Sequence, residues 1–268
     1  MKRLLATVAA VASLTLAAAC GSSDDNSSGS GSRSGASASA SSGGVSGTVT
    51  VFAAASLTES FTTLGKRFEA AHPGTTVKFN FGPSSGLAES INQGAPADVF
   101  ASASPTNMQQ VVDAGGASDS TTFANNVMQI AVPPDNPANV TQVTDLAKSG
   151  VKVALCQPQV PCGKVAQEVF KKANITVMPV TQGADVKAVL TTVQLGEVDA
   201  GMVYQTDVQA AGTKVKGIVI PADQNASTSY PIASLTKAPN EAGAAAFVDY
   251  VLSPDGEKVL SQAGFAAP

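Results

Sequence analysis

The chain has 268 residues, with 16 Lys and Arg against 20 Asp and Glu and a formal net charge of −4 at pH 7. It contains one His, no Trp and no cluster of basic residues, which argues against a nucleic-acid partner because phosphate backbones are held by grouped Lys and Arg. Beyond its N-terminal segments roughly 220 residues remain, enough for one large domain or for two lobes with their own cores.

The first twenty residues have the layout of a secretory signal, in which two basic residues precede a small and apolar run from Leu4 to Ala19. That run is too short for a comfortable membrane span. Its end, LAAAC at residues 16–20, resembles a bacterial lipobox, in which Cys20 becomes the lipid-carrying first residue after cleavage. Ordinary cleavage near Ala19 without a lipid is the alternative. We expect residues 1–20 to be a signal peptide with a lipobox.

Residues 21–46 are almost wholly Gly, Ser, Ala and Asp and contain no aromatic side chain. Such a composition buries too little apolar surface to offset the entropy of ordering, so it predicts a disordered tether. If Cys20 carries lipid, Cys156 and Cys162 remain as a pair in an oxidising exterior, and we expect a disulfide between them. So short a loop would add only about 2 kcal/mol, which favours a role in fixing local shape. Two free thiols are the alternative, and a zinc site is weaker because His72 alone could join them.

From Gly47 onward, short β-branched runs alternate with amphipathic helical stretches. Strands are predicted at 48–52, 77–81, 98–101, 127–132, 151–155, 200–204, 215–220 and 232–235. Helices are predicted at 57–68, from near 87, and at 108–114, 164–172, 186–195, 241–252 and 254–262. This alternation indicates an α/β fold with mostly parallel sheets. In such sheets ligands bind beyond the carboxyl ends of strands, where helices begin.

The segment FAAASLTE at residues 52–59 ends a strand and begins a helix. Ser56 and Glu59 match the Ser-x-x-Glu capping box, in which the serine side chain caps the helix. The small residues before Ser56 would let a ligand approach the backbone. Free backbone N–H groups and the positive end of the helix dipole form a ready anion site there. A plain helix cap is the commoner role for such a serine.

The segment FGPSSGL at residues 81–87 repeats this arrangement of strand, polar turn and helix start. Its Gly82-x-Ser84-x-Gly86 pattern also matches the nucleophile elbow of hydrolases. A secreted serine hydrolase is disfavoured, because its triad needs a histidine downstream of the serine and His72 lies upstream. Ser84 is therefore expected to donate hydrogen bonds rather than to act as a nucleophile, and Ser85 could share or take that role.

Three further positions follow the same logic. Cys162 opens a helix inside the expected disulfide loop, where its N–H could point into a site. Asp185 is the expected N-cap of the next helix, which leaves the Val186 N–H without an intrahelical partner. Tyr204 closes a strand, where its hydroxyl could reach a crevice. Taken alone, each of these is more simply a cap, a turn or a tyrosine at the edge of the core.

From about Thr48 to Phe265 the chain resembles the molybdate-binding subunits of ABC-type importers, most closely in VFAAASLT at 51–58 and QGAPADVF at 93–100. The resemblance implies a periplasmic-binding-protein type II fold, in which two α/β lobes are joined by crossing strands and close on the anion like a hinge. We expect lobe 1 to comprise 47–126 and 230–268 and lobe 2 to comprise 127–229, with crossings near Val127 and Ser229.

The resemblance also implies a set of ligand-binding residues. Ser56 and Ser84 would contribute hydroxyl and backbone donors, Cys162 and Val186 their backbone N–H groups, and Tyr204 its hydroxyl. Relatives often place Ala before the glycine of the third segment, where this chain has Cys162. The backbone donor survives that change, but the size of the cavity is put in doubt.

The expected protein is a monomer and not an enzyme, anchored by lipid alone to the outer face of the cytoplasmic membrane. It would capture molybdate, and also tungstate, and deliver it to an ABC importer permease, with no cofactor and no bare metal cation. A receptor specific for sulfate or for tungstate is the alternative among binding proteins. Uncharged donors suit a fully deprotonated dianion, at about 1.5–3 kcal/mol for each charge-assisted hydrogen bond. Sulfate fits the same donors. Phosphate carries a proton that needs a hydrogen-bond acceptor, and Asp185 lies near enough in the sequence to supply one. A surface interaction protein without a small ligand is a third alternative.

Overall fold

The computed structural model describes residues 45–268, so the expected signal peptide, the lipid-bearing Cys20 and nearly all of the tether lie outside the described residues. Strands and helices alternate through most of this part of the chain. The strands are β1 (Gly47–Ala54), β2 (Thr75–Gly82), β3 (Val99–Ala101), β4 (Thr121–Val132), β5 (Val153–Cys156), β6 (Thr181–Gly183), β7 (Ala200–Tyr204), β8 (Lys216–Val219) and β9 (Ser227–Ser234). The helices are α1 (Thr58–Ala71), α2 (Ser84–Asn92), α3 (Pro105–Asp113), α4 (Pro161–Lys172), α5 (Val186–Gln194), α6 (Gln205–Ala211), α7 (Glu241–Leu252) and α8 (Pro254–Gln262), with short 3₁₀ turns at Ala55–Leu57, Val143–Ala147 and Gly212–Lys214.

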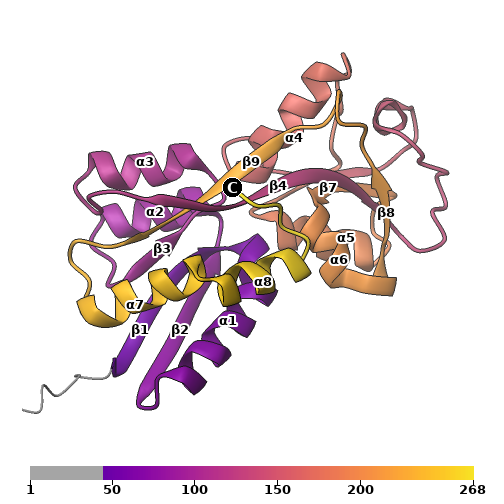
Figure 1. Cartoon of the computed structure of the whole chain (residues 1–268). Helices are drawn as coiled ribbons and strands as arrows, with labels where there is room; N and C mark the ends of the chain where they lie inside the picture. The colour runs from indigo at the N-terminus through magenta and orange to yellow at the C-terminus, as the bar shows by residue number, and fades with distance from the viewer. Residues whose placement is uncertain (1–44) are drawn as a thin grey trace, which may run out of the picture. The chain divides into compact units, whose positions relative to one another are not determined.

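The strands form one mixed sheet in the order β2-β1-β3-β9-β4-β7-β5-β6, and β8 pairs with β4 beside this path. β1 runs parallel to β2 and β3, and β5 runs parallel to β6 and β7, whereas the pairs made by β4 and β9 are antiparallel. Figure 1 shows the long strands β4 and β9 side by side between these two parallel groups. β4 pairs with β9 as far as Val127 and with β7 from Met128 onward, so it changes partner between consecutive residues.

The first parallel group is buried on both faces, as parallel strands generally are. Along β1, Val49 and Val51 belong to one core with α1, α7 and α8, while Phe52 belongs to a second core with α2 and α3. Helix α1 fits the first core because Phe61 and Phe68 lie on one face of it, and both rings pack edge-on against Phe247 at centroid distances of 6.1 and 5.3 Å. A fully buried phenylalanine contributes about 1.5–3 kcal/mol, so these rings hold α1 and α7 against the sheet.

The second parallel group has its own apolar core, built mainly from valine, leucine and alanine between β5, β7, α4 and α5. Gly201 in β7 lets α5 pack closely, since a Cβ atom there would lie 2.8 Å from Val193 and 2.9 Å from Val189. Within residues 45–268, none of the helices combines the length and apolar character that crossing a membrane would take.

Three of the sequence predictions about elements were wrong or incomplete. β4 begins at Thr121 rather than 127, because its polar first half is stabilised by pairing with β9 and not by an apolar pattern. β9 begins at Ser227 and runs through Pro231, which was expected to precede the strand. Proline has no backbone N–H, so a strand tolerates it where the ladder needs no donor at that position. The register of β4 shifts opposite Pro231, and the Pro231 carbonyl still accepts a hydrogen bond from the Ser102 N–H. β6 and α6 are short and were not predicted.

The predicted α/β class is confirmed, and α7 and α8 have the predicted bounds. The division into two lobes that move about a hinge stays a prediction.

Candidate ligand-binding site

One pocket is lined by all five residues that the sequence singled out. Its empty volume, part of which is open to solvent, is about 230 Å³. Its walls come from the ends of β1, β2 and β7 and from the starts of α2, α4 and α5. This is where ligands bind in α/β sheets, because strands end and helix N-termini begin there. Small and apolar residues and one carboxylate complete the lining, which contains no Lys or Arg: Ala54, Ala55, Gly82, Pro83, Ala103, Val160, Pro161 and Asp185.

Ser84 is the first residue of α2, so its backbone N–H has no acceptor within the helix. Its side chain is buried, and the Oγ accepts a hydrogen bond of 2.9 Å from the Ala103 N–H. Because the Oγ is already an acceptor there, the hydroxyl hydrogen remains free to be donated. Ser85 is only half buried and does not line the pocket, so the structure places Ser84 rather than its neighbour at the site.

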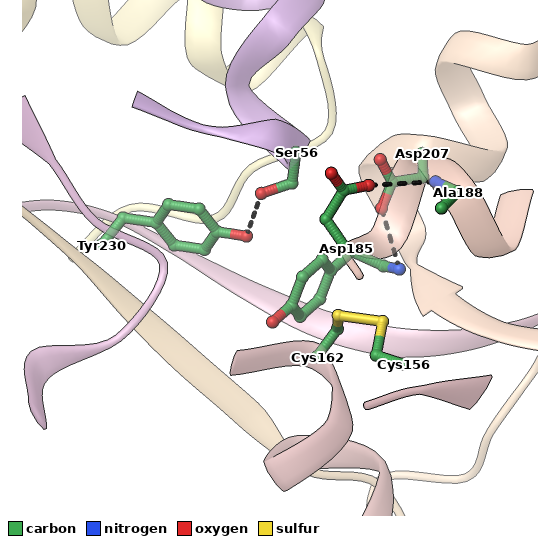
Figure 2. The surroundings of a disulfide bond; sticks show 8 residues. Ser56, Cys156, Cys162, Asp185, Ala188, Asp207 and Tyr230 are labelled. Atoms are coloured by element: carbon green, nitrogen blue, oxygen red, sulfur yellow. Dashed lines mark hydrogen bonds between the residues drawn. A yellow bond between two sulfur atoms is a disulfide. The ribbon is translucent and has the colours of Figure 1, made fainter. Parts of the chain in front are cut away.

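The predicted capping box at Ser56 was wrong. Ser56 lies in the 3₁₀ turn before α1, Leu57 takes the N-cap position without a side-chain cap, and the carboxylate of Glu59 binds Lys187 at 2.7 Å. The Oγ of Ser56 lies 2.8 Å from the hydroxyl oxygen of Tyr230. Figure 2 shows the two side chains pointing toward each other. The extra 3₁₀ turn moves Ser56 out of the capping position, and a tertiary partner replaces the local one.

The opposite wall supplies backbone donors. Cys162 is the second residue of α4, after Pro161 at the first position, so its N–H also lies among the unpaired donors of a helix start. Asp185 caps α5 as predicted, accepting from the Ala188 N–H at 2.9 Å, and Val186 is the first residue of that helix. Cys162 is joined to Cys156, at the end of β5, by a disulfide bond beside the pocket (Figure 2).

Gly163 was missed by the sequence reasoning, although it follows Cys162 directly. A Cβ atom at this position would lie 2.0 Å from the carbonyl oxygen of Gln157 and 3.1 Å from that of Cys156. Only glycine therefore lets the turn after β5 pack against the start of α4. The disulfide and this glycine together fix where the Cys162 N–H lies.

Tyr204 is fully buried, and its hydroxyl has no hydrogen-bond partner among the described residues. Burial raises the pKa of this phenol well above its ordinary value, so the hydroxyl stays protonated and able to donate. A buried polar group left without a partner costs about 1–3 kcal/mol, and such a cost is typical of a position where a ligand supplies the acceptor.

Behind the pocket lies an ion pair that the sequence did not reveal. Lys187 follows Val186 in α5, and its Nζ lies 3.0 Å from Oδ1 of the buried Asp207 and 2.7 Å from Oε2 of Glu59. The other oxygen of Asp207 accepts from the Tyr204 N–H at 3.0 Å. Burial raises the pKa of Asp207 to about 6, against the opposing effect of the Lys187 charge. These residues are distant in the sequence, so no local pattern could have joined them.

Among residues 45–268, the pocket that Ser84 lines contains no histidine to act as its base. Its Oγ is held by a backbone N–H, while His72 ends α1 with its ring 4.4 Å from that of Phe68. Within residues 45–268, no group of three or more His, Cys, Asp or Glu side chains is placed to hold a metal ion.

Comparison with known proteins identifies the family. Residues 49–266 match the family described as bacterial extracellular solute-binding protein. The chain belongs to this family. Over 222 residues this solute-binding protein is 40% identical to the molybdate-binding protein ModA of Mycobacterium tuberculosis, which covers 82% of this chain and 85% of the relative. It is 34% identical over 228 residues to the putative ABC transporter substrate-binding lipoprotein YvgL of Bacillus subtilis, covering 82% and 86%.

Solved structures agree with the fold. The substrate-binding domain of a putative molybdenum ABC transporter from Clostridium difficile superposes with a TM-score of 0.63 at 26% identity, over 82% of this chain and 99% of that one. The periplasmic molybdate-binding protein of Azotobacter vinelandii gives a TM-score of 0.74 at 20% identity over the same shares, which shows the fold alone. The predicted periplasmic-binding-protein fold is thus confirmed, and the solute-binding protein is not an enzyme.

Proposed function

We propose that this solute-binding protein captures molybdate, and also tungstate, in the pocket between Ser56 and Val186 and delivers it to the permease of an ABC importer. One observation carries the proposal: neutral hydrogen-bond donors from three helix starts and two strand ends surround a single pocket without Lys or Arg. The relatives of this chain include several molybdate-binding proteins, which supports the choice of anion.

The donors suit a tetrahedral dianion. Each charge-assisted hydrogen bond contributes about 1.5–3 kcal/mol, so five donors together can offset much of the cost of dehydrating the ion. The N-termini of α2, α4 and α5 add their dipoles, which favour negative charge by about 0.3–1 kcal/mol each. No cofactor is needed for this chemistry.

The balance of donors and acceptors disfavours a protonated ligand such as hydrogen phosphate. Most of the polar groups in the lining donate, and the one carboxylate there, Asp185, uses Oδ1 to accept from the Ala188 N–H, which leaves only its other oxygen as an acceptor for a ligand proton. Ser84 Oγ uses one lone pair for the Ala103 N–H and keeps its hydrogen to donate. Sulfate meets the same donors as molybdate, so discrimination between them depends on the radius of the cavity and on the length of the bonds from the central atom of each anion to its oxygens.

Capture would involve closure of two lobes, residues 47–126 with 230–268 against residues 127–229. The partner change of β4 between Val127 and Met128 supports a hinge there, because one strand serves both parallel groups. An anion that contacts Ser56 and Ser84 on one lobe and Cys162, Val186 and Tyr204 on the other stabilises only the closed form. The protein would act as a monomer, held to the outer face of the membrane by lipid on Cys20.

Isothermal titration of the secreted chain with molybdate, tungstate, sulfate and phosphate tests the proposal. Molybdate and tungstate should each bind at one site at least tenfold more tightly than sulfate, and phosphate should not bind measurably. Ser84→Ala should weaken molybdate binding at least tenfold, while the matched control Ser85→Ala should leave it unchanged. Sulfate binding as tight as that of molybdate would contradict the proposed specificity.

A further inference from the structure

A chain of buried polar side chains from β4, α6 and β9 leads to Ser56. The amide nitrogen of Asn126, in β4, lies 2.8 Å from Oγ1 of Thr206 in α6 and 3.5 Å from the hydroxyl oxygen of Tyr230 in β9. That hydroxyl lies in turn 2.8 Å from the Oγ of Ser56 (Figure 2). All four side chains are at least nine-tenths buried.

The direction of these hydrogen bonds follows from the chemistry of the amide. Oδ1 of Asn126 accepts from the Val127 N–H at 3.0 Å, which turns the amide nitrogen toward Thr206 and Tyr230. An amide nitrogen can only donate, so the Tyr230 oxygen accepts from Asn126. Ser56 Oγ is the one other hydrogen-bond partner of this hydroxyl among the described residues, so the single hydrogen of the phenol points to Ser56.

Ser56 therefore accepts from Tyr230 and keeps its own hydrogen for another partner. Its side chain lines the ligand pocket. We propose that Tyr230, oriented by Asn126, is a positioning residue that commits the Ser56 hydroxyl to donate into the pocket. The inference rests on the proposed function, because it needs an anion there to accept the hydrogen bond.

The same polarity is found at the second serine by independent means, since Oγ of Ser84 accepts from the Ala103 N–H. Both serines are thus held as donors before any ligand arrives. A pocket prepared in this way favours an oxyanion that carries no proton over one that must donate, since each serine oxygen already uses one of its two lone pairs and keeps its hydrogen to donate. Burial also raises the pKa of Tyr230, so its hydrogen is retained at physiological pH.

Tyr230 also has a purely structural role, which the test must separate from positioning. Its ring packs edge-on against Phe265 at a centroid distance of 5.3 Å and against Phe123 and Tyr204 at 6.2 Å each. Tyr230→Phe keeps these contacts and removes only the hydroxyl. Any effect of this variant that passes through Ser56 must vanish when Ser56 has no hydroxyl.

The experiment is a double-mutant cycle of Tyr230→Phe and Ser56→Ala, with isothermal titration of the full secreted chain against molybdate and against phosphate. Tyr230→Phe should weaken molybdate binding about fivefold, because the Ser56 hydroxyl loses its preferred direction. Ser56→Ala should weaken molybdate binding at least tenfold. The double variant should bind molybdate as Ser56→Ala does. Tyr250→Phe, which removes a phenol hydroxyl from α7 away from the pocket, is the matched control and should change nothing.

Selectivity gives a readout that a structural role would not move. In Tyr230→Phe the serine oxygen is free to accept, so the preference for molybdate over phosphate should fall. An unchanged affinity in Tyr230→Phe, or an equal loss with and without the Ser56 hydroxyl, would overturn the inference while leaving the proposed function intact. A wild-type chain that binds none of the oxyanions would overturn both.

Discussion

Replacing Lys187 with Met removes the ammonium group that lies 3.0 Å from the buried carboxylate of Asp207. The Asp207 side chain is 0% exposed and that of Lys187 is 23% exposed, so the pair is largely withdrawn from water. Breaking a buried pair from one side costs about 3–5 kcal/mol, because the remaining charge stays desolvated. The partial exposure of Lys187 places the expected loss at the lower end, about 3 kcal/mol, which lowers the melting temperature by about 6–12 °C for a domain of this size.

Glu59 offers the contrast within the same cluster. Its side chain is 53% exposed, and its bond to Lys187 bridges α1 and α5. Exposed ion pairs contribute about 0.2–1 kcal/mol, so Glu59→Gln should lower stability by less than about 1 kcal/mol. The double variant Lys187→Met with Asp207→Asn should recover most of the loss, because a neutral amide can still accept from the Tyr204 N–H.

Calorimetric or circular-dichroism melting of the ligand-free chain at pH 7.5 measures these differences, with Lys171→Met on the exposed side of α4 as the matched control. The folded pKa of Asp207 is raised from 3.8 to about 6, so the folded state binds its proton more tightly than the unfolded state does. The stability of wild type relative to Asp207→Asn should therefore be highest below pH 4 and should be lost as the pH rises through 6. A loss below about 1 kcal/mol in Lys187→Met, or no recovery in the double variant, would refute the reasoning.

Three further changes test the walls of the pocket. Ser84→Ala should lower the melting temperature slightly as well as weaken molybdate binding, because it leaves the buried Ala103 N–H without its acceptor; an unchanged melting temperature would contradict this contact. The double variant Cys156→Ser with Cys162→Ser should lower the free energy of unfolding by about 2 kcal/mol, measured with denaturant, and should weaken molybdate binding. In the intact wild-type protein, thiol labelling should find no free thiol at these two positions. Gly163→Ala should lower the free energy of unfolding by about 1–3 kcal/mol and weaken molybdate binding, because the new Cβ would lie 2.0 Å from the Gln157 carbonyl oxygen. Gly115→Ala is the control, since nothing lies within 4 Å of its Cβ. It should affect stability only through its positive φ of 73° and leave the affinity unchanged.

The sequence predicted those elements whose signals are local. α8 begins at its predicted residue because Ser253 caps it and Pro254 takes its first position. α5 likewise begins after its predicted cap, Asp185. The bounds of β4 and β9 were wrong because their pairing with each other sets where they begin, and neither an apolar pattern nor Pro231 reports that pairing.

The candidate site shows the same division. Strand ends and helix starts could be located from the sequence, and the five residues that this pattern and the family resemblance together singled out line one pocket. Their contribution to ligand binding stays a prediction. The partner of Ser56 could not be predicted, because Tyr230 is 174 residues away and the local capping signal pointed to Glu59. The Lys187 ion pair was equally hidden, since Asp207 and Glu59 approach it only in the folded chain.

The measurement that tests the central claim most directly is a crystal structure of the secreted chain with tungstate, whose anomalous scattering locates the metal. We predict a single strong peak within the pocket, with its oxygens at hydrogen-bond distance from the hydroxyls of Ser56, Ser84 and Tyr204 and from the N–H groups of Cys162 and Val186. A peak elsewhere, or an anion held by Lys or Arg side chains, would contradict capture by uncharged donors.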